Sequence, residues 1–345
     1  MKTNHKIIFN NATNMDKIES ESVDLMITSP PYPMIQMWDE MFSEQSGDIK
    51  KALKEEHGDL AFELMHKELD KVWKEVFRVL KKGGIACVNV GDATRKINSS
   101  FKLYPNHARI ISYCSQLGFH VLPEILWRKQ TNAPNKFMGS GMLPPGAYVT
   151  LEHEYILILR KGGKREFKTN EEKANRQNSS YFWEERNIWF SDIWIDIKGN
   201  KQKLSDEKIR NRSAAYPFEL AYRLINMFSV HGDIVLDPFL GTGTTTIAAM
   251  ASGRNSIGVE IDQNFLDTIN EKVSGIVDFS NMWNENRLKR HLEFVKKREE
   301  EKGKLGYVNE HHKFHVMTRQ ERMIKIPKLK IINYPSKNIF EIEYD

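Results

Sequence analysis

Short apolar runs that alternate with longer amphipathic stretches constrain the fold of this chain most strongly. Six runs stand out: HKIIF, VDLMI, GIACVNV, YILIL, DIVLD and SIGVE. This alternation is typical of strands that are connected through helices into a largely parallel sheet. One connecting helix is predicted over residues 66–82, where apolar residues recur every three or four positions before Gly83 and Gly84. The sequence therefore predicts an α/β fold.

Composition limits the classes of protein that need to be considered. The 345 residues are 40% hydrophobic and 28% charged, which is enough for a large core in one or two domains. No apolar run approaches the length of a membrane span, and the polar start MKTNHK does not resemble a signal peptide. We therefore expect a cytoplasmic protein with no membrane partner. The formal net charge of +5 suits a polyanionic partner, but many enzymes without such a partner are equally basic.

The chain has few residues that could form a disulfide framework or a metal site. Cys87 and Cys114 are its two cysteines, which fits a reducing compartment. His311 and His315 lie four residues apart in EHHKFH, but neither an HExxH motif nor a cysteine accompanies them. A solvated surface is the better interpretation of this segment, and no metal is predicted.

Two adjacent prolines follow the run VDLMI directly, in the segment TSPPY at residues 28–32. A rigid turn with Tyr32 buried in the core is one interpretation, because prolines punctuate many loops. An active-site loop whose backbone must be held rigid is the other.

A second motif, DIVLDPFLGTGTTTIAAM, predicts a strand, a glycine-containing turn and an apolar helix. Gly241 and Gly243 allow a ligand to approach the backbone closely, and the start of the helix offers free amide groups. Glu260 ends the next apolar run, where its carboxylate could accept hydrogen bonds from both hydroxyls of a ribose. By itself, the motif also fits an ordinary tight turn.

Three classes of cofactor compete for this turn. A P-loop requires a lysine that is not found after Gly243, so ATP hydrolysis is not expected. A dinucleotide fingerprint requires a third glycine, and Thr246 stands in its place. A nucleoside without a pyrophosphate, S-adenosyl-L-methionine, fits best.

TSPPY together with DPFLGTGTT resembles the amino-methyltransferases of DNA, which methylate cytosine at N4 or adenine at N6. The catalytic tetrapeptide precedes the cofactor motif, which is similar to the permuted beta group of this family. The resemblance covers most of residues 5–275. It implies a seven-stranded, mostly parallel Rossmann-like sheet with an inserted target-recognition region, in a prokaryotic type II restriction-modification methylase.

The resemblance also implies a division of the chain. Residues 1–161 are expected to form the catalytic half of the core, interrupted by a charged insertion at residues 43–65. Residues 162–211 are assigned to target recognition, and residues 212–275 to the cofactor-binding half. Residues 276–345 are predicted to form a basic C-terminal extension, whose charge run RLKRHLEFVKKREEEKGK indicates a helix with a solvated face.

In this family, catalysis belongs to the tetrapeptide, here Ser29, Pro30, Pro31 and Tyr32. An exocyclic amine is a poor nucleophile, because its lone pair is delocalised into the base. The Ser29 hydroxyl and the Pro30 carbonyl are expected to accept its hydrogen bonds as the nitrogen becomes tetrahedral. The prolines fix the backbone, and Tyr32 stacks on the flipped base.

The resemblance assigns S-adenosyl-L-methionine to residues from both halves of the core. Asn11 departs from the family pattern, which commonly has Asp after its first strand, and a solvated loop is an equal alternative for it. The full set expected at the cofactor comprises Asn11, Thr28, Tyr216, Asp237, Phe239, Gly241, Gly243, Thr244, Glu260 and Ile261.

Double-stranded DNA is the expected partner, and its target base must be flipped out of the duplex to reach the cofactor. The polar, aromatic and basic block at residues 162–211 is the leading candidate for reading the sequence. An ordinary surface charge is at least as good an interpretation of each of its basic residues, Arg165, Lys168, Arg176, Arg186 and Arg210. A cognate endonuclease and a homodimer are left open.

Ser in place of Asp before the two prolines favours cytosine N4 over adenine N6 as the target. Methylation of cytosine C5 would require a reactive thiolate, and Cys87 and Cys114 lie in apolar patterns. Three alternatives stay open: an adenine N6 enzyme, an RNA amino-methyltransferase, and a nucleic-acid-binding protein that keeps the fold without turnover.

Overall fold

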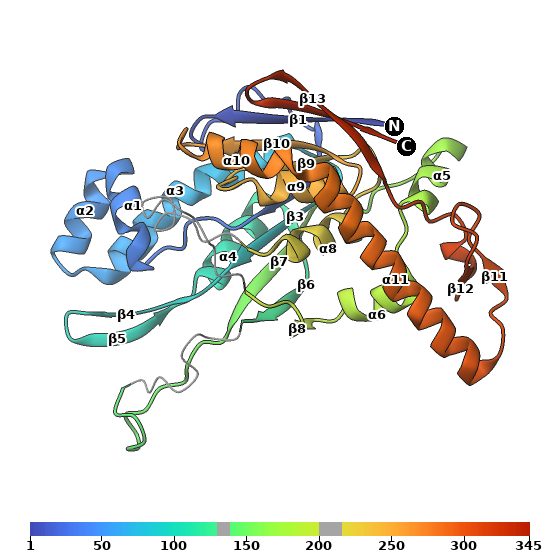
Figure 1. The fold of residues 1–345 in the computed structure, drawn as a ribbon. Helices are drawn as coiled ribbons and strands as arrows, with labels where there is room; N and C mark the ends of the chain where they lie inside the picture. The colour runs from blue at the N-terminus through green and yellow to red at the C-terminus, as the bar shows by residue number, and fades with distance from the viewer. Residues whose placement is uncertain (130–138, 200–215) are drawn as a thin grey trace.

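The computed structural model describes residues 1–129, 139–199 and 216–345. In these parts of the chain, ten strands form one large sheet with helices packed on both of its faces (Figure 1). In sheet order the strands are β13 (Leu329–Ser336), β14 (Ile339–Tyr344), β1 (Lys2–Phe9), β10 (Asn255–Glu260), β9 (Ile234–Asp237), β2 (Val23–Thr28), β3 (Leu80–Val90), β7 (His153–Lys161), β6 (Phe119–Arg128) and β8 (Ile193–Trp194).

The centre of the sheet is parallel and both of its sides contain antiparallel pairs. β1, β10, β9, β2 and β3 run parallel to one another, whereas β14 is antiparallel to β1 and β7 is antiparallel to both β3 and β6. All six apolar runs seen in the sequence are strands of this sheet. The predicted α/β fold is therefore confirmed, and β13, β14 and β8 widen the sheet beyond seven strands.

Helices and two small hairpins complete the described structure. The helices are η1 (Gln36–Trp38), α1 (Asp39–Gln45), α2 (Gly47–Lys54), α3 (Gly58–Val79), α4 (Asn106–Leu117), α5 (Asn170–Asn178), α6 (Trp183–Trp189), α8 (Phe218–Phe228), α9 (Thr244–Ala251), α10 (Phe265–Ser274), α11 (Ile276–Lys302) and η2 (Arg319–Glu321). The hairpins pair β4 (Ala93–Ile97) with β5 (Ser100–Tyr104) and β11 (Tyr307–Val308) with β12 (His315–Val316). Across the described residues, no helix is both long and apolar enough to cross a membrane.

The long helix α3 differs at both ends from the helix predicted over residues 66–82. It begins at Gly58, so the second part of the expected charged insertion belongs to this helix. It ends at Val79, because Leu80 adopts an extended backbone and starts β3, which continues through Gly83 and Gly84.

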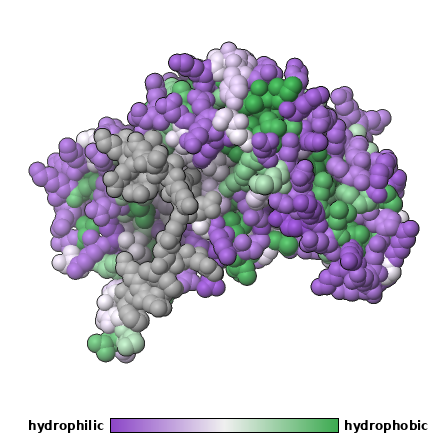
Figure 2. All heavy atoms as spheres, in the orientation of Figure 1, coloured by the Kyte–Doolittle hydropathy of each residue, from purple (hydrophilic) through white to green (hydrophobic). Residues whose placement is uncertain are grey.

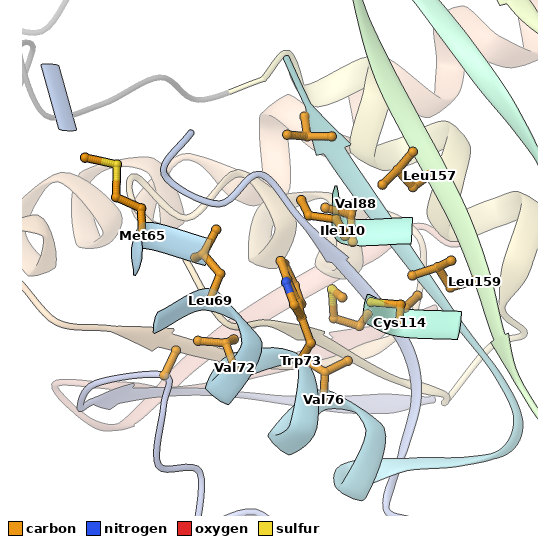
Figure 3. Close-up of a cluster of buried hydrophobic side chains, with 14 of the residues drawn as sticks. Met65, Leu69, Val72, Trp73, Val76, Val88, Ile110, Cys114, Leu157 and Leu159 are labelled. Carbon is orange, nitrogen blue, oxygen red and sulfur yellow. The ribbon is translucent and has the colours of Figure 1, made fainter. Parts of the chain in front are cut away.

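The inner face of α3 anchors the catalytic half of the sheet. Figure 3 shows Trp73 between neighbouring side chains of α3 and the apolar residues of β3, β7 and α4. Trp73 is 1% exposed, and burying a large apolar side chain stabilises a fold by about 1.5 to 3 kcal/mol. The labelled members of this cluster are Met65, Leu69, Val72, Trp73, Val76, Val88, Ile110, Cys114, Leu157 and Leu159.

The C-terminal residues, which were predicted to form a basic extension, contribute to the core of the sheet. β14 pairs antiparallel with β1, and its buried Phe340 and Ile342 pack with Ile7 in one apolar cluster. The charge run lies in α11 as predicted, but the face of this helix that packs on the molecule also carries charge. Arg287 is buried there and donates two hydrogen bonds to the carboxylate of Glu185.

Candidate active site

Four parallel strands end side by side at one edge of the sheet, which we call the carboxyl edge. Phe9 of β1 lies opposite Glu260 of β10, and Gly258 of β10 lies opposite Asp237 of β9. β2 pairs with β9 on the other side and leads directly into Ser29. Ligands of open α/β sheets bind beyond the carboxyl ends of the strands. The structure therefore brings the expected cofactor residues and the tetrapeptide to one place.

Asp237 joins the catalytic and cofactor segments at this edge. Its Oδ1 accepts hydrogen bonds from Thr28 Oγ1 at 2.7 Å and from the Phe239 amide at 3.0 Å. Its Oδ2 accepts from Thr245 Oγ1 at 2.5 Å and from Tyr216 Oη at 3.1 Å. One buried carboxylate thus connects the last residue of β2 with the loop after β9, the start of α9 and the segment before α8.

Burial governs the ionisation of this cluster. It raises the pKa of Asp237, although the four hydrogen bonds that the carboxylate accepts oppose the shift. Burial, together with the charge of Asp237, also raises the pKa of Tyr216 well above its ordinary value. Tyr216 therefore acts as a neutral hydrogen-bond donor, and Thr245, which the sequence analysis did not select, shares its partner.

The two glycines of the turn share a left-handed backbone but have different surroundings. Gly241 has a φ of +52°, and an added Cβ would meet only the Phe239 carbonyl oxygen at 4.0 Å, so the space in front of it is open. Gly243 has a φ of +81°, but an added Cβ would approach Ile269 of α10 to 3.2 Å. Gly241 faces open space, whereas Gly243 packs against protein just before Thr244 begins α9.

Glu260 is oriented by backbone amides. Its carboxylate accepts hydrogen bonds from the Gly241 amide at 2.7 Å and the Asp262 amide at 2.9 Å, and burial raises its pKa. Each carboxylate oxygen has a second lone pair, so the group keeps acceptor capacity for a ligand. Ile261, the next residue, is 58% exposed beside it.

The loop after β1 lies against the same strand end. The Asn10 amide donates to the Glu260 carbonyl oxygen at 2.9 Å. Asn11 is half-buried, and its Oδ1 accepts from the Thr13 amide at 2.9 Å. The Asn11 side chain therefore stabilises its own turn next to Glu260 and still has acceptor capacity.

The tetrapeptide is tied to residues that the sequence analysis did not select. Ser29 Oγ lies 2.8 Å from Tyr32 Oη, and Tyr32 Oη donates to Glu154 Oε2 at 3.1 Å. Asn89 Nδ2 donates to both Tyr32 Oη and Glu154 Oε2, at 3.0 and 2.6 Å. Lys129 forms an ion pair with the other oxygen of Glu154. The signal in the sequence is a polar residue inside each of two apolar runs, GIACVNV and HEYILIL.

Comparison with known proteins identifies the family. The N6/N4 methyltransferase family model, described as DNA methylase, matches residues 23–271. The chain belongs to the N6/N4 DNA methylase family.

Relatives of this methylase cover most of its length. It is 53% identical over 345 residues to the type II methyltransferase M.MthZI of Methanothermobacter thermautotrophicus, covering all of this chain and 96% of that one. It is also 54% identical over 282 residues to the type II methyltransferase M.MjaI of Methanocaldococcus jannaschii. That match covers 79% of this chain and 91% of M.MjaI. Among solved structures, a Thermus thermophilus protein described as a DNA modification methylase, in complex with S-adenosyl-L-methionine, is 34% identical to this chain. The two structures superimpose with a TM-score of 0.62, and the match covers 79% of this chain and 94% of the Thermus protein. S-adenosyl-L-methionine is the cofactor of the methylase.

The structure places Arg165 and Arg176, two of the selected basic residues of block 162–211, at the edge of the sheet opposite the carboxyl edge. Arg165 Nη1 lies 2.6 Å from Asp233, just before β9, and 3.5 Å from Asp24, near the start of β2. These acidic residues mark the opposite edge of the sheet, and α5, which carries Arg176, packs there through Asn175 and the His231 carbonyl. Figure 1 shows α5 on the side of the sheet away from α1 and the β4–β5 hairpin.

The other selected basic residues of this block are Lys168, Arg186 and Arg210. Lys168 precedes α5, and its Nζ lies 3.3 Å from Glu166. Arg186 is exposed on α6, a helix bound to α11 through Glu185 and Arg287. Arg210 lies outside the described residues. Arg165 forms a structural ion pair with Asp233, and its contact with DNA stays a prediction.

Proposed function

We propose that the methylase transfers a methyl group from S-adenosyl-L-methionine to N4 of cytosine in duplex DNA, as the modification enzyme of a type II restriction-modification system. The observation that carries this proposal is the environment of Ser29. Its hydroxyl is engaged by Tyr32, while its neighbour Thr28 is bound to Asp237 at the cofactor turn. The Ser29 hydroxyl, which can accept a hydrogen bond from an amine, is therefore separated by one peptide bond from Thr28, which is bound to the cofactor turn.

The residues at the carboxyl edge fit the methyl donor that the family uses. Glu260 offers acceptor capacity for ribose hydroxyls, and the open space at Gly241 allows close approach of a nucleoside to the backbone. When bound, the cofactor supplies an electrophilic methyl group on a sulfonium. The chain supplies Ser29 Oγ and the Pro30 carbonyl, which stabilise the positive charge that develops on the attacking amine.

The preference for cytosine rests on the first residue of the tetrapeptide. Adenine enzymes of this family more often carry Asp there, whereas this chain carries the neutral Ser29. The choice between the two bases changes the product but not the direct transfer to an exocyclic nitrogen.

DNA must approach the carboxyl edge, because the base is methylated there after it has been flipped out of the helix. In Figure 1, α1, α2 and the β4–β5 hairpin lie on the side of this edge, and residues 139–152 project away from the sheet below the hairpin. Met142 and Val149 in the last of these segments are 81% and 87% exposed, and the outer end of the segment is hydrophobic in Figure 2. Apolar side chains of this kind enter DNA between bases. Block 162–211 stays the sequence-based prediction for target recognition.

The decisive experiment identifies the modified nucleoside. The full chain is expressed in a host without DNA methylases, and its DNA is digested to nucleosides for mass spectrometry. N4-methylcytosine is the expected product, and DNA from cells that express Ser29→Ala is the control. N6-methyladenine would contradict the choice of base, whereas 5-methylcytosine or an unmodified genome would contradict direct transfer to an amine.

The proposal includes partners and a location that follow from this role. A restriction endonuclease with the same recognition sequence would cut unmodified DNA in the same cytoplasm. A homodimer is a separate prediction, tested by the molar mass of the purified chain in light scattering.

A further inference from the structure

Ser29 is one end of a chain of hydrogen bonds that runs from the tetrapeptide into the sheet. Ser29 Oγ, Tyr32 Oη and Glu154 Oε2 follow one another at 2.8 and 3.1 Å. Ser29 and Tyr32 belong to the loop after β2, whereas Glu154 is the second residue of β7. Glu154 is 9% exposed, so the chain of hydrogen bonds ends on a buried carboxylate.

Asn89 fixes the direction of the protons in this chain. Its Nδ2 can only donate, and it donates to both Tyr32 Oη and Glu154 Oε2. The single proton of Tyr32 points to the carboxylate, since a carboxylate can only accept. The Ser29 hydroxyl therefore donates to Tyr32, and its lone pairs are left to accept from a substrate. Asn89 Oδ1 is buried and has no hydrogen-bond partner among the described residues, which indicates that its amide is oriented toward Tyr32 and Glu154.

The chemistry of amine methylation requires such a path. When the lone pair of the exocyclic nitrogen forms the new N–CH3 bond, the S–CH3 bond breaks and its electron pair stays on sulfur. The nitrogen then carries a positive charge until it loses a proton. A neutral serine hydroxyl cannot retain that proton, because a protonated hydroxyl is a very strong acid. A base beyond Ser29 is therefore needed.

We propose that Glu154 is the proton acceptor of the methyl transfer and receives the proton through Ser29 and Tyr32. The amine proton passes to Ser29 Oγ, the Ser29 proton to Tyr32 Oη, and the Tyr32 proton to Glu154 Oε2. This inference rests on the proposed transfer to an exocyclic amine and holds for cytosine and adenine alike.

The surroundings of the chain of hydrogen bonds support this sequence of proton transfers. Burial and the charge of Glu154 raise the pKa of Tyr32 well above its ordinary value, so the phenol gives up its proton only as it receives another. The ammonium group of Lys129 pairs with Oε1 of Glu154. The Lys129 side chain is 40% exposed, so this ion pair extends from the buried carboxylate to the surface.

Tyr32→Phe is the sharpest test, because it keeps the ring that stacks on a base and removes only the hydroxyl. We expect the single-turnover methylation rate to fall by roughly 100-fold or more, the usual contribution of a positioned acid or base. Glu154→Gln should lower the rate to a similar extent. Because both variants interrupt one path, the double variant should be no slower than the slower single variant.

The readouts separate proton transfer from a structural role. The wild-type rate should rise with pH to a plateau and show a solvent deuterium isotope effect, and both features should be lost in Tyr32→Phe and Glu154→Gln. Affinity for S-adenosyl-L-methionine and for DNA, measured by calorimetry, should change less than about threefold, well under one tenfold step. Glu343→Gln is the matched control, since Glu343 of β14 is paired with Lys2 at the start of β1, the end of that strand away from the carboxyl edge.

The outcomes that overturn the inference differ from those that overturn the proposed function. A wild-type enzyme that forms no methylated amine refutes the function. A wild-type enzyme that methylates DNA, with a Tyr32→Phe variant of full activity, refutes the proton path alone. Additive losses in the double variant, or an unchanged isotope effect, also refute it. If Glu154→Gln does not fold, Tyr32→Phe decides.

Discussion

Thr28 and Ser29 are neighbours in the chain, but their hydroxyls have different partners. Thr28 binds the buried Asp237, and Ser29 binds Tyr32 at the start of the proton path. Ser29→Ala removes an acceptor that acts mainly in the transition state, so we expect the single-turnover rate to fall by roughly ten- to a thousandfold. Affinity for cofactor and DNA should hardly change.

Rapid-quench measurement of methyl transfer to a DNA duplex tests this prediction. Full activity of Ser29→Ala would contradict the assigned mechanism. Ser22→Ala is a suitable control, because Ser22 is half-buried, just before β2, and its hydroxyl bonds only to the Glu19 carbonyl oxygen among the described residues.

Glu260 provides the second prediction for a single residue. Glu260→Ala should weaken S-adenosyl-L-methionine binding by about 1.5 to 3 kcal/mol, the range for hydrogen bonds to a charged group. The amides of Gly241 and Asp262 also lose their acceptor, so the thermal stability of the variant must be measured beside its affinity in calorimetry. Asp267→Ala, in an exposed position on α10, is the control, and equal affinity of Glu260→Ala and wild type would refute the assignment.

At the scale of elements, the turn between β9 and α9 depends on its contact with α10. Gly243 and Gly232 both have a φ of +81°, but an added Cβ meets Ile269 only at Gly243 and nothing within 4 Å at Gly232. Alanine at either position costs about 1 to 2 kcal/mol through the left-handed backbone. Only Gly243→Ala should also displace the turn from α10 and weaken cofactor binding. Equal cofactor affinity of the two variants in calorimetry would show that the contact with Ile269 has no role.

Most of the strands that could be predicted from the sequence are buried on both faces. All six residues of β2 are buried, so VDLMI forms an uninterrupted apolar run. β8 has two residues, and β13 exposes most of its side chains, so neither has a pattern that stands out. The partners of the tetrapeptide depend on register: Val90 of β3 lies opposite Tyr155 of β7, which brings Glu154 beside the end of β3. The register between β3 and β7 cannot be predicted from the spacing of residues in the sequence.

For the whole molecule, two buried histidines predict sensitivity to acid. His5 in β1 and His66 in α3 are fully buried, and burial lowers the pKa of each to about 3. His66 Nε2 is bound to Asn106, and its Nδ1 has no partner among the described residues, so a proton there would lack an acceptor. Below pH 6.5 the unfolded chain binds protons that the folded chain does not, and the free energy of unfolding therefore falls as pH falls.

At a pH below the unfolded pKa, each histidine is expected to lower the free energy of unfolding by on the order of 1.4 kcal/mol per pH unit. Urea denaturation at pH 7, 6 and 5 measures it. His66→Gln should show a smaller loss between pH 6.5 and 5, by about 2 kcal/mol. His57→Gln, whose histidine has a 60% exposed side chain, should keep the full wild-type loss. Identical pH dependence in all three proteins would exclude His66 as a contributor.

The strand order also determines when each strand can pair with its neighbours during synthesis of the chain. Among the described strands β1 leaves the ribosome before the others, yet its two neighbours in the sheet, β10 and β14, begin only at Asn255 and Ile339. At about 5 to 20 residues per second, β1 waits on the order of 10 to 50 seconds for β10. During that interval Ile7 and Ile8 have no sheet to join, although β2 and β3 can already pair. Nascent chains stalled before residue 255 should therefore be cut by protease near β1 and should be recognised there by chaperones.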